Sequence, residues 1–242
     1  MTTTLVLGAT GNTGQPLVEQ LLRKNHKVRI IVRSPHKLSA EILENPNAKI
    51  IEAAILDLSD AEMATHVEGC DAVVSCLGHN LDFNGMFGNP RNLCTDAVRR
   101  LCMAIRKNNA SKPTKFILMN TVGVPNPNID AQRRWFERLL LTILRYTIPP
   151  HRDNETAAEH LHQVVGIKNK HIEWCAVRPD TLINAEVSPY EISASPSTGI
   201  FTGRPTTRSN VAHFMIELIE KPKLWNKWKF QMPVIMNANE SV

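Results

Sequence analysis

Residues 3–22 read TTLVLGATGNTGQPLVEQLL, and this stretch decides the fold class. Its first five residues form a β-branched and apolar run that is typical of a buried strand. Three glycines follow at Gly8, Gly11 and Gly14. Apolar residues then recur at helical spacing at Leu17, Val18, Leu21 and Leu22. The stretch predicts a strand, a glycine turn and a helix.

Each glycine of this turn has a separate physical use when a phosphate lies against it. Gly8 lets the chain turn sharply, Gly11 lets a pyrophosphate approach the backbone, and Gly14 lets the helix lie close to the sheet. The free N–H groups at the start of the helix attract anions. Further hydrogen bonds are available from the side chains of Thr10, Asn12 and Thr13. The alternative is a tight strand-to-helix connection that holds no ligand.

Strand-like and helical patterns alternate along the chain. The strand-like runs are Thr3–Leu7, Lys27–Arg33, Lys49–Asp57, Asp71–Leu77, Lys115–Thr121, Ile172–Arg178 and Lys229–Met236. Several are continuously apolar, as in a parallel sheet that helices cover on both faces. Ser34-Pro35 and Ser59-Asp60 are typical helix starts. The alternation predicts an α/β protein with a doubly wound, mainly parallel Rossmann sheet and helices on both faces.

The domain organisation predicted from the sequence is a single domain over residues 1–242, because no linker or internal repeat interrupts the pattern. The pattern weakens at 78–90, 123–130 and 179–205. Each of these segments follows the carboxyl end of a predicted strand, where ligands of open α/β sheets bind. We therefore expect residues 179–208 to form a small C-terminal region that covers a substrate.

Composition narrows the classes of function. The net charge of +5 is scattered, and no block is basic enough to indicate a nucleic-acid arm. No run reaches the roughly 18 apolar residues that span a bilayer. The N-terminus shows no secretory signal, and the five cysteines show no paired spacing. We expect a cytoplasmic protein with reduced cysteines, no metal, and no nucleic-acid or membrane partner, as a monomer or homodimer.

The sequence resembles the atypical and extended short-chain dehydrogenase/reductases, the NmrA-like and flavin-reductase-like group. GATGNTG is similar to the GxxGxxG motif of this group, and WCAVRPDTL and TTRSNVAHFMIELI are similar to its later segments. The resemblance covers most of the chain and implies a nicotinamide cofactor. It does not identify a substrate.

Within this resemblance, the end of the second strand indicates the choice of dinucleotide. NAD-binding domains usually carry a carboxylate there, which grips the ribose 2′-hydroxyl. Here IIVRSPHK places Arg33, Ser34 and Lys37 at this position, and a guanidinium suits a 2′-phosphate. NADP(H) is therefore favoured over NAD(H).

The resemblance also implies the rest of the cofactor site. Asp57 and Leu58 would lie beside the adenine, with Asp57 accepting a hydrogen bond from its exocyclic amine. The remaining cofactor-binding residues would be Cys76, Leu77, Gly78, Asn120 and Pro179.

The catalytic pattern of the superfamily is incomplete in this chain. Main-branch members use Ser, Tyr and Lys with YxxxK spacing, but neither Tyr146 nor Tyr190 is followed by a lysine four residues later. Asn120 and Thr121 stand in the region of the family's serine, and either residue would orient an acceptor.

Proton delivery would come from solvent or from His151, which shares a helix face with Glu155. Glu155, or Asn154 one residue earlier, stands where the family's lysine is usual. A solvated helix start capped by Asp153 is the alternative interpretation of this segment.

Two functions remain open. The first is an NADPH-dependent reductase that transfers hydride to a small planar acceptor such as a flavin or quinone, or to a carbonyl. The second is a non-enzymatic NmrA-like sensor in which the dinucleotide regulates a partner. An epimerase-like enzyme is a nearby variant of the first.

Overall fold

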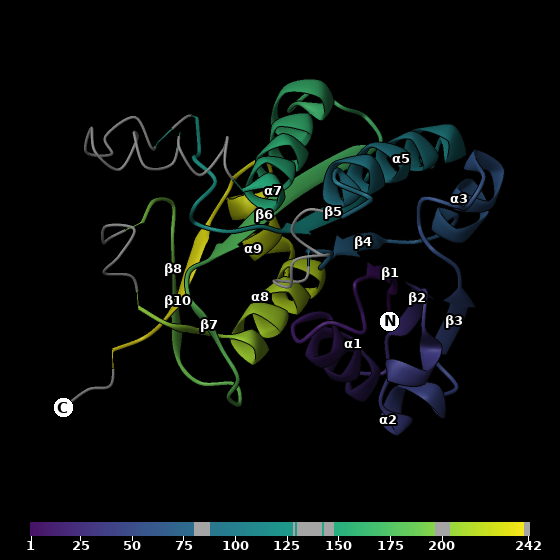
Figure 1. The fold of residues 1–242 in the computed structure, drawn as a ribbon, viewed down its shortest axis with the longest axis horizontal. Coiled ribbons are helices and arrows are strands. Elements are labelled where there is room, and N and C mark those ends of the chain that lie inside the picture. Colours follow the sequence, from purple (N-terminus) through teal and green to yellow (C-terminus); the bar gives the residue numbers. More distant parts are fainter. Residues whose placement is uncertain (80–87, 128, 130–141, 143–147, 197–203, 240–242) are drawn as a thin grey trace.

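The computed structural model describes residues 1–79, 88–127, 129, 142, 148–196 and 204–239. Its main sheet contains eight strands in the order β3-β2-β1-β4-β5-β6-β10-β8 (Figure 1). All neighbouring pairs are parallel except β10 and β8. The strands are β1 (Thr3–Leu7), β2 (Lys27–Val32), β3 (Ala48–Glu52), β4 (Ala72–Ser75), β5 (Thr114–Met119), β6 (Ile172–Pro179), β8 (Tyr190–Ser193) and β10 (Val234–Asn237). The fold is therefore the predicted doubly wound α/β sheet.

Helices cover both faces of this sheet (Figure 1). One face packs against α3 (Asp60–Val67), α5 (Leu93–Asn108), α7 (Pro149–Glu159) and the π-helix η3 (His160–Val165). The other face packs against α1 (Gly14–Arg23), α2 (Ala40–Leu43), α8 (Arg208–Glu220) and α9 (Pro222–Trp228). Two layers of buried apolar side chains result, as the continuously apolar strands predict.

The region expected to cover a substrate adds structure at one edge of the sheet. Within residues 179–208, β8 pairs antiparallel with β10, and β7 (Leu182–Ile183) pairs with β9 (Thr206–Thr207). Residues 197–203 of this region lie outside the described residues. Of the described chain, no helix has both the length and the apolar character needed to cross a membrane.

Several predicted boundaries differ from the structure. Strand β3 ends at Glu52, because residues 53–58 turn back with a hydrogen bond from Asp57 N to Ala54 O. Ser34-Pro35 opens only the 3-10 turn η1 (Pro35–Lys37). The last strand, β10, begins at Val234 rather than Lys229, and Phe230 between them has a positive φ of 63°, outside the β region. Ser59 caps α3 as predicted, in a capping box with Glu62.

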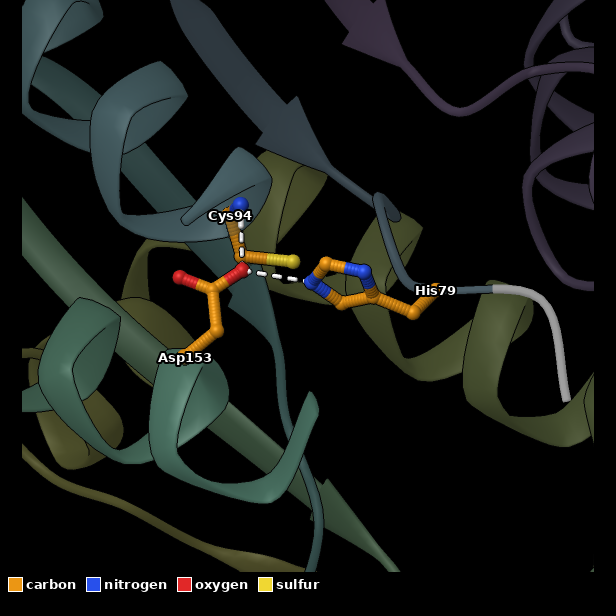
Figure 2. Close-up of side chains that lie close together, drawn as sticks. All are labelled: His79, Cys94 and Asp153. Atoms are coloured by element: carbon orange, nitrogen blue, oxygen red, sulfur yellow. Dashed lines mark hydrogen bonds and ion pairs between the residues drawn. The ribbon is translucent and has the colours of Figure 1, made fainter. Parts of the chain in front are cut away.

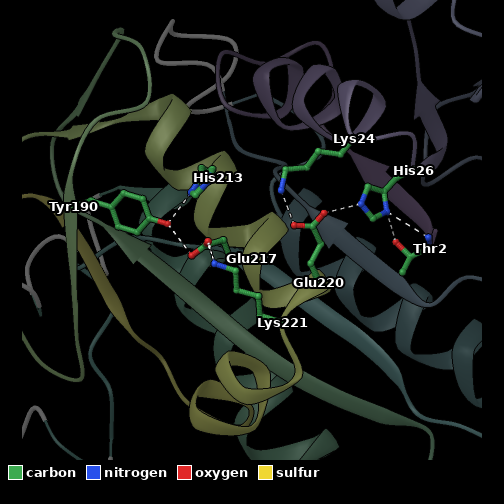
Figure 3. Close-up of polar contacts among 8 residues, drawn as sticks. All are labelled: Thr2, Lys24, His26, Tyr190, His213, Glu217, Glu220 and Lys221. Carbon is green, nitrogen blue, oxygen red and sulfur yellow. Dashed lines mark hydrogen bonds and ion pairs between the residues drawn. The ribbon is translucent and has the colours of Figure 1, made fainter.

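Helix α8 is held to the start of β2 by a polar cluster (Figure 3). Glu220 accepts a hydrogen bond from Lys24 Nζ at 2.6 Å, and its other oxygen lies 2.9 Å from His26 Nε2. Burial alone would raise the pKa of Glu220, but the contacts with Lys24 and His26 hold it below its usual value. The cluster fixes α8 beside α1, at the end opposite the glycine turn.

Candidate functional site

The predicted cofactor residues meet at one edge of the sheet. Leu7 pairs with Ile31 and with Ser75, and Ser75 pairs with Leu118, so the carboxyl ends of β1, β2, β4 and β5 lie side by side. The strand order reverses at β1, with β2 on one side and β4 on the other. In open α/β sheets such a reversal leaves a crevice for a ligand.

The glycine turn shows which of its glycines the fold itself requires. Gly8 has a φ of +76°, and a Cβ atom there would lie 2.4 Å from the carbonyl oxygen of Cys76. A Cβ atom at Gly14 would lie 2.1 Å from Gly8 O. A Cβ atom at Gly11 would meet only Gly8 O, at 3.2 Å, and Gly11 is exposed. Packing therefore explains Gly8 and Gly14, whereas Gly11 leaves space on the outer side of the turn.

The amino end of α1 is open toward that space. No side chain caps this helix, although Thr13 is its N-cap residue. Thr10 and Asn12 are exposed, and Thr13 is buried. Among the described residues, none accepts a hydrogen bond from the amides of Asn12, Thr13 or Gly14. These amides and the two exposed side chains form a cradle of donors that fits a phosphate group.

The exit of β2 carries an exposed positive charge. Arg33 and Lys37 are exposed, and Ser34 is half-buried at the start of η1. Within the described part of the chain, no carboxylate forms an ion pair with Arg33 or Lys37. Arg33 directly follows β2, which pairs with β1, and the sequence predicts the 2′-phosphate at this exit.

The exits of β3 and β4 lie at the same edge of the sheet. After β3, the Asp57 side chain is exposed and Leu58 is buried. After β4, burial raises the pKa of the Cys76 thiol to about 12, so it stays protonated at neutral pH. Leu77 is half-buried, and a Cβ atom at Gly78 would face open space. These residues can line the adenosine side of the proposed cofactor site. Asp57 is the one carboxylate among them.

The proposed catalytic residues follow β5. Asn120 is buried, and both ends of its amide are engaged: Nδ2 donates to Asn154 O at 3.0 Å, and Oδ1 accepts from Thr121 N at 2.9 Å. Asn120 therefore joins β5 to α7. Thr121 Oγ1 accepts a bond from Gly123 N at 3.3 Å, which leaves its hydroxyl hydrogen available to another acceptor.

His151 is brought to the same place from α7. A Cβ atom at Gly123 would lie 3.2 Å from His151 Cε1 and 3.7 Å from Thr121 Cγ2. Gly123 therefore lies between the imidazole and the threonine methyl group. The predicted catalytic residues Thr121 and His151 thus both lie close to Gly123, after the carboxyl end of β5. Pro179, at the end of β6, is buried beside it in the sheet.

Asp153 does not cap a solvated helix start, which corrects that alternative interpretation. Its carboxylate is buried and accepts hydrogen bonds from Cys94 N at 2.8 Å and Thr95 N at 2.9 Å. Asp153 of α7 thus caps the first turn of α5, and His79 Nε2 lies 2.8 Å from the same carboxylate (Figure 2). The N-cap of its own helix is Ile148, followed by two prolines.

His79, Cys94 and Asp153 each offer one potential metal-ligand atom, and these three atoms lie within 4.8 Å of one another (Figure 2). Burial and the neighbouring Asp153 charge raise the pKa of the Cys94 thiol well above its usual value. Burial alone would raise the pKa of Asp153, but bonds from His79, Thr95 and Cys94 hold it below its usual value. Because the Asp153 carboxylate already accepts these hydrogen bonds, we assign it the role of a cap for helix α5.

Tyr190 is held against α8 (Figure 3). Its hydroxyl lies 2.8 Å from His213 Nδ1 and donates to Glu217 Oε2 at 3.2 Å. Burial, reinforced by the charge of Glu217, raises the pKa of Tyr190. These contacts give Tyr190 a structural role. Tyr146 lies outside the described residues.

Comparison with known proteins identifies the family. Residues 8–222 match the NAD(P)H-binding family. The chain belongs to the NAD(P)H-binding family. The match begins at the first glycine of the turn, and it confirms the predicted nicotinamide cofactor and Rossmann fold at the level of the family.

Curated relatives of this NAD(P)H-binding protein include fungal oxidoreductases. Oxidoreductase dmxR7 of Cryptosporiopsis sp. is 26% identical over 150 residues, which cover 58% of this chain and 60% of that protein. Averufin oxidase A of Aspergillus flavus is 24% identical over 200 residues, 76% of this chain and 66% of that protein. The chain spans between 40% and 60% of the length of the first three relatives that it matches.

Solved structures show the same fold. The oxidoreductase ylbE from Lactococcus lactis has a TM-score of 0.69 at 16% identity, covering 99% of this chain and 92% of that one. ChuY, an anaerobillin reductase from Escherichia coli O157:H7, has a TM-score of 0.69 at 15% identity, covering 100% of both chains. The Bordetella bronchiseptica enzyme WbmH, solved with NAD+, has a TM-score of 0.62 at 14% identity and covers 91% and 72%. At such identities the likeness establishes the fold alone.

Proposed function

We propose that this protein is an NADPH-dependent oxidoreductase that transfers a hydride to a small planar acceptor, such as a flavin or quinone, or to a carbonyl compound. The observation that carries the cofactor part is Gly11. A Cβ atom there would meet only Gly8 O, at 3.2 Å, so packing constrains this position less than Gly8 or Gly14, and it lies just before the uncapped start of α1. Approach of a pyrophosphate explains that glycine.

The preference for NADPH over NADH rests on the exit of β2. Arg33 and Lys37 are exposed and follow the strand that pairs with β1, and Arg33 stands where NAD-binding domains usually carry a carboxylate. A 2′-phosphate would gain charge-assisted hydrogen bonds from the guanidinium and from Ser34. Asp57 would accept a hydrogen bond from the adenine amine.

The substrate would lie at the carboxyl end of β5. When bound, reduced nicotinamide supplies the hydride, so the protein has to place the acceptor and provide a proton. Thr121 is oriented by Gly123 N and would donate its hydroxyl hydrogen to the acceptor's carbonyl. His151, one small residue away, would protonate the reduced product.

The named activities of relatives support an oxidoreductase, since they include oxidoreductase dmxR7, averufin oxidase A and anaerobillin reductase ChuY. One observation favours the alternative, an NmrA-like sensor without catalysis. The hydroxyl of Tyr190 is engaged by His213 and Glu217, so this tyrosine does not supply the family's usual proton donor. The position of His151 against Gly123, in the loop that also carries Thr121, favours the enzyme.

Two measurements test the proposal. Calorimetric titration with NADPH and NADH should show tight binding of NADPH. NADPH oxidation should then be followed with a flavin, a quinone and a carbonyl acceptor. Turnover of any of them supports the reductase. Binding without turnover of all three favours the sensor, and absence of binding to either dinucleotide overturns both.

A further inference from the structure

Arg100 of α5 reaches across to the turn that follows β3. Its Nη1 donates to the carbonyl oxygens of Ile55 at 3.0 Å and Leu56 at 2.8 Å. Its Nη2 donates to Leu58 O and lies 3.3 Å from Asp60 Oδ1. One guanidinium therefore satisfies three carbonyls within four consecutive residues, and its side chain is 19% exposed.

This turn is fixed from several sides. The Ile55 and Leu58 side chains are buried in the core layer that α5 also helps to form. The capping box of Ser59 and Glu62 holds the end of the turn at the start of α3. Asp57 alone projects an exposed side chain, and it lies between the carbonyls that Arg100 holds. Arg100 thus holds the backbone carbonyls on both sides of Asp57.

We infer that Arg100 is a positioning residue for the adenine half of the dinucleotide site. The inference rests on the proposed function, because it assigns the turn carrying Asp57 and Leu58 to the adenine. A guanidinium replaces three separate hydrogen-bond donors in one rigid plane, so the turn keeps its shape before the ligand arrives. Loss of Arg100 would leave these carbonyls to water and would free the turn to adopt other shapes.

Two fragments of NADPH, tested separately, distinguish a role of Arg100 at the adenine half from a general effect on cofactor binding. Adenosine carrying a 2′-phosphate and a 5′-phosphate contains only the adenine half, and reduced nicotinamide mononucleotide contains only the other half. Arg100→Met keeps the apolar stem and removes the donors. We expect it to weaken binding of the adenine fragment and of NADPH about tenfold, with binding of the nicotinamide fragment unchanged. In steady-state assays the KM for NADPH should rise while kcat at saturating NADPH stays constant.

Arg29 offers a matched control. Its Nη1 also binds backbone carbonyls, those of His66 at 2.8 Å and Glu68 at 2.6 Å, but at the far end of α3. Arg29→Met should therefore lower the thermal midpoint as Arg100→Met does, with no change in affinity for either fragment.

The outcomes distinguish this inference from the proposed function. If the unmutated protein binds neither NADPH nor the adenine fragment, the proposed function fails and this inference with it. If it binds both, and Arg100→Met binds the adenine fragment equally well, only the role of Arg100 is overturned. Equal weakening by the Arg29 variant also overturns it, because the effect would then be general destabilisation.

Discussion

The imidazole of His151 lies directly against Gly123, because a Cβ atom at that glycine would come within 3.2 Å of His151 Cε1. His151 belongs to α7, and Gly123 belongs to the loop after β5. Two segments that are separated in sequence thus contribute to one candidate catalytic site. Because Gly123 has no side chain, the imidazole of His151 has room to lie against the loop.

Gly123→Val should therefore displace His151 from Thr121. We expect turnover to fall about tenfold or more, because a shifted proton donor loses its geometry. The affinity for NADPH should stay unchanged, since the glycine turn and β2 exit are untouched. Single-turnover kinetics with calorimetric titration would check both. Full activity in Gly123→Val together with full activity in His151→Gln would remove His151 from the mechanism.

Gly11 and Gly14 should respond differently to alanine. Gly11→Ala should change the free energy of unfolding by less than about 1 kcal/mol and weaken NADPH binding, because the methyl group occupies the proposed pyrophosphate space. Gly14→Ala should destabilise the fold severely, because its Cβ atom would lie 2.1 Å from Gly8 O. Urea unfolding and calorimetric titration measure the two effects. Unaltered NADPH affinity in Gly11→Ala would mean that the turn is only structural.

Arg33→Glu should reverse or abolish the preference for NADPH. A lost charge-assisted contact to the 2′-phosphate costs about 1.5–3 kcal/mol, and the new carboxylate would repel that phosphate. Affinity for NADH should change little. Exposed Lys27, at the amino end of β2, provides a control in Lys27→Glu, which changes the net charge equally. Equal affinities for NADPH and NADH in the unmutated protein would rule out the role of Arg33.

Asp153→Asn should destabilise the protein in a pH-dependent way. At neutral pH we expect a loss of about 1–3 kcal/mol, because Cys94 N and Thr95 N donate to different oxygens of the carboxylate, and asparagine offers only one acceptor oxygen in their place. The folded-state pKa of Asp153 is lowered, so its stabilising effect is complete above the unfolded value of about 4 and is lost as pH falls through the folded-state value.

The difference in stability between Asp153→Asn and the unmutated protein should accordingly shrink as the solution is acidified below that range. Chemical unfolding at a series of pH values measures it. Asp57→Asn is the control, since Asp57 is exposed and caps no helix. A difference that stays constant down to the most acidic condition would contradict an ionised Asp153 cap.

The sequence by itself determined the sheet and the edge at which the candidate site residues gather. Continuous apolar runs mark strands buried on both faces, and a glycine turn between a strand and a helix specifies a local geometry that needs no distant partner. The parallel order then brings Gly8, Arg33, Asp57, Cys76 and Asn120 to one edge, because each directly follows a strand or the turn after one.

Only the tertiary structure decided which polar groups meet. Asp153 looked like a local helix cap, yet it caps α5, because buried amides are satisfied by whichever carboxylate packing brings within reach. The same holds for Arg100, whose carbonyl partners lie more than 40 positions earlier in the chain. Contacts at such separation depend on how helices dock on the sheet, and no spacing in the sequence encodes that docking.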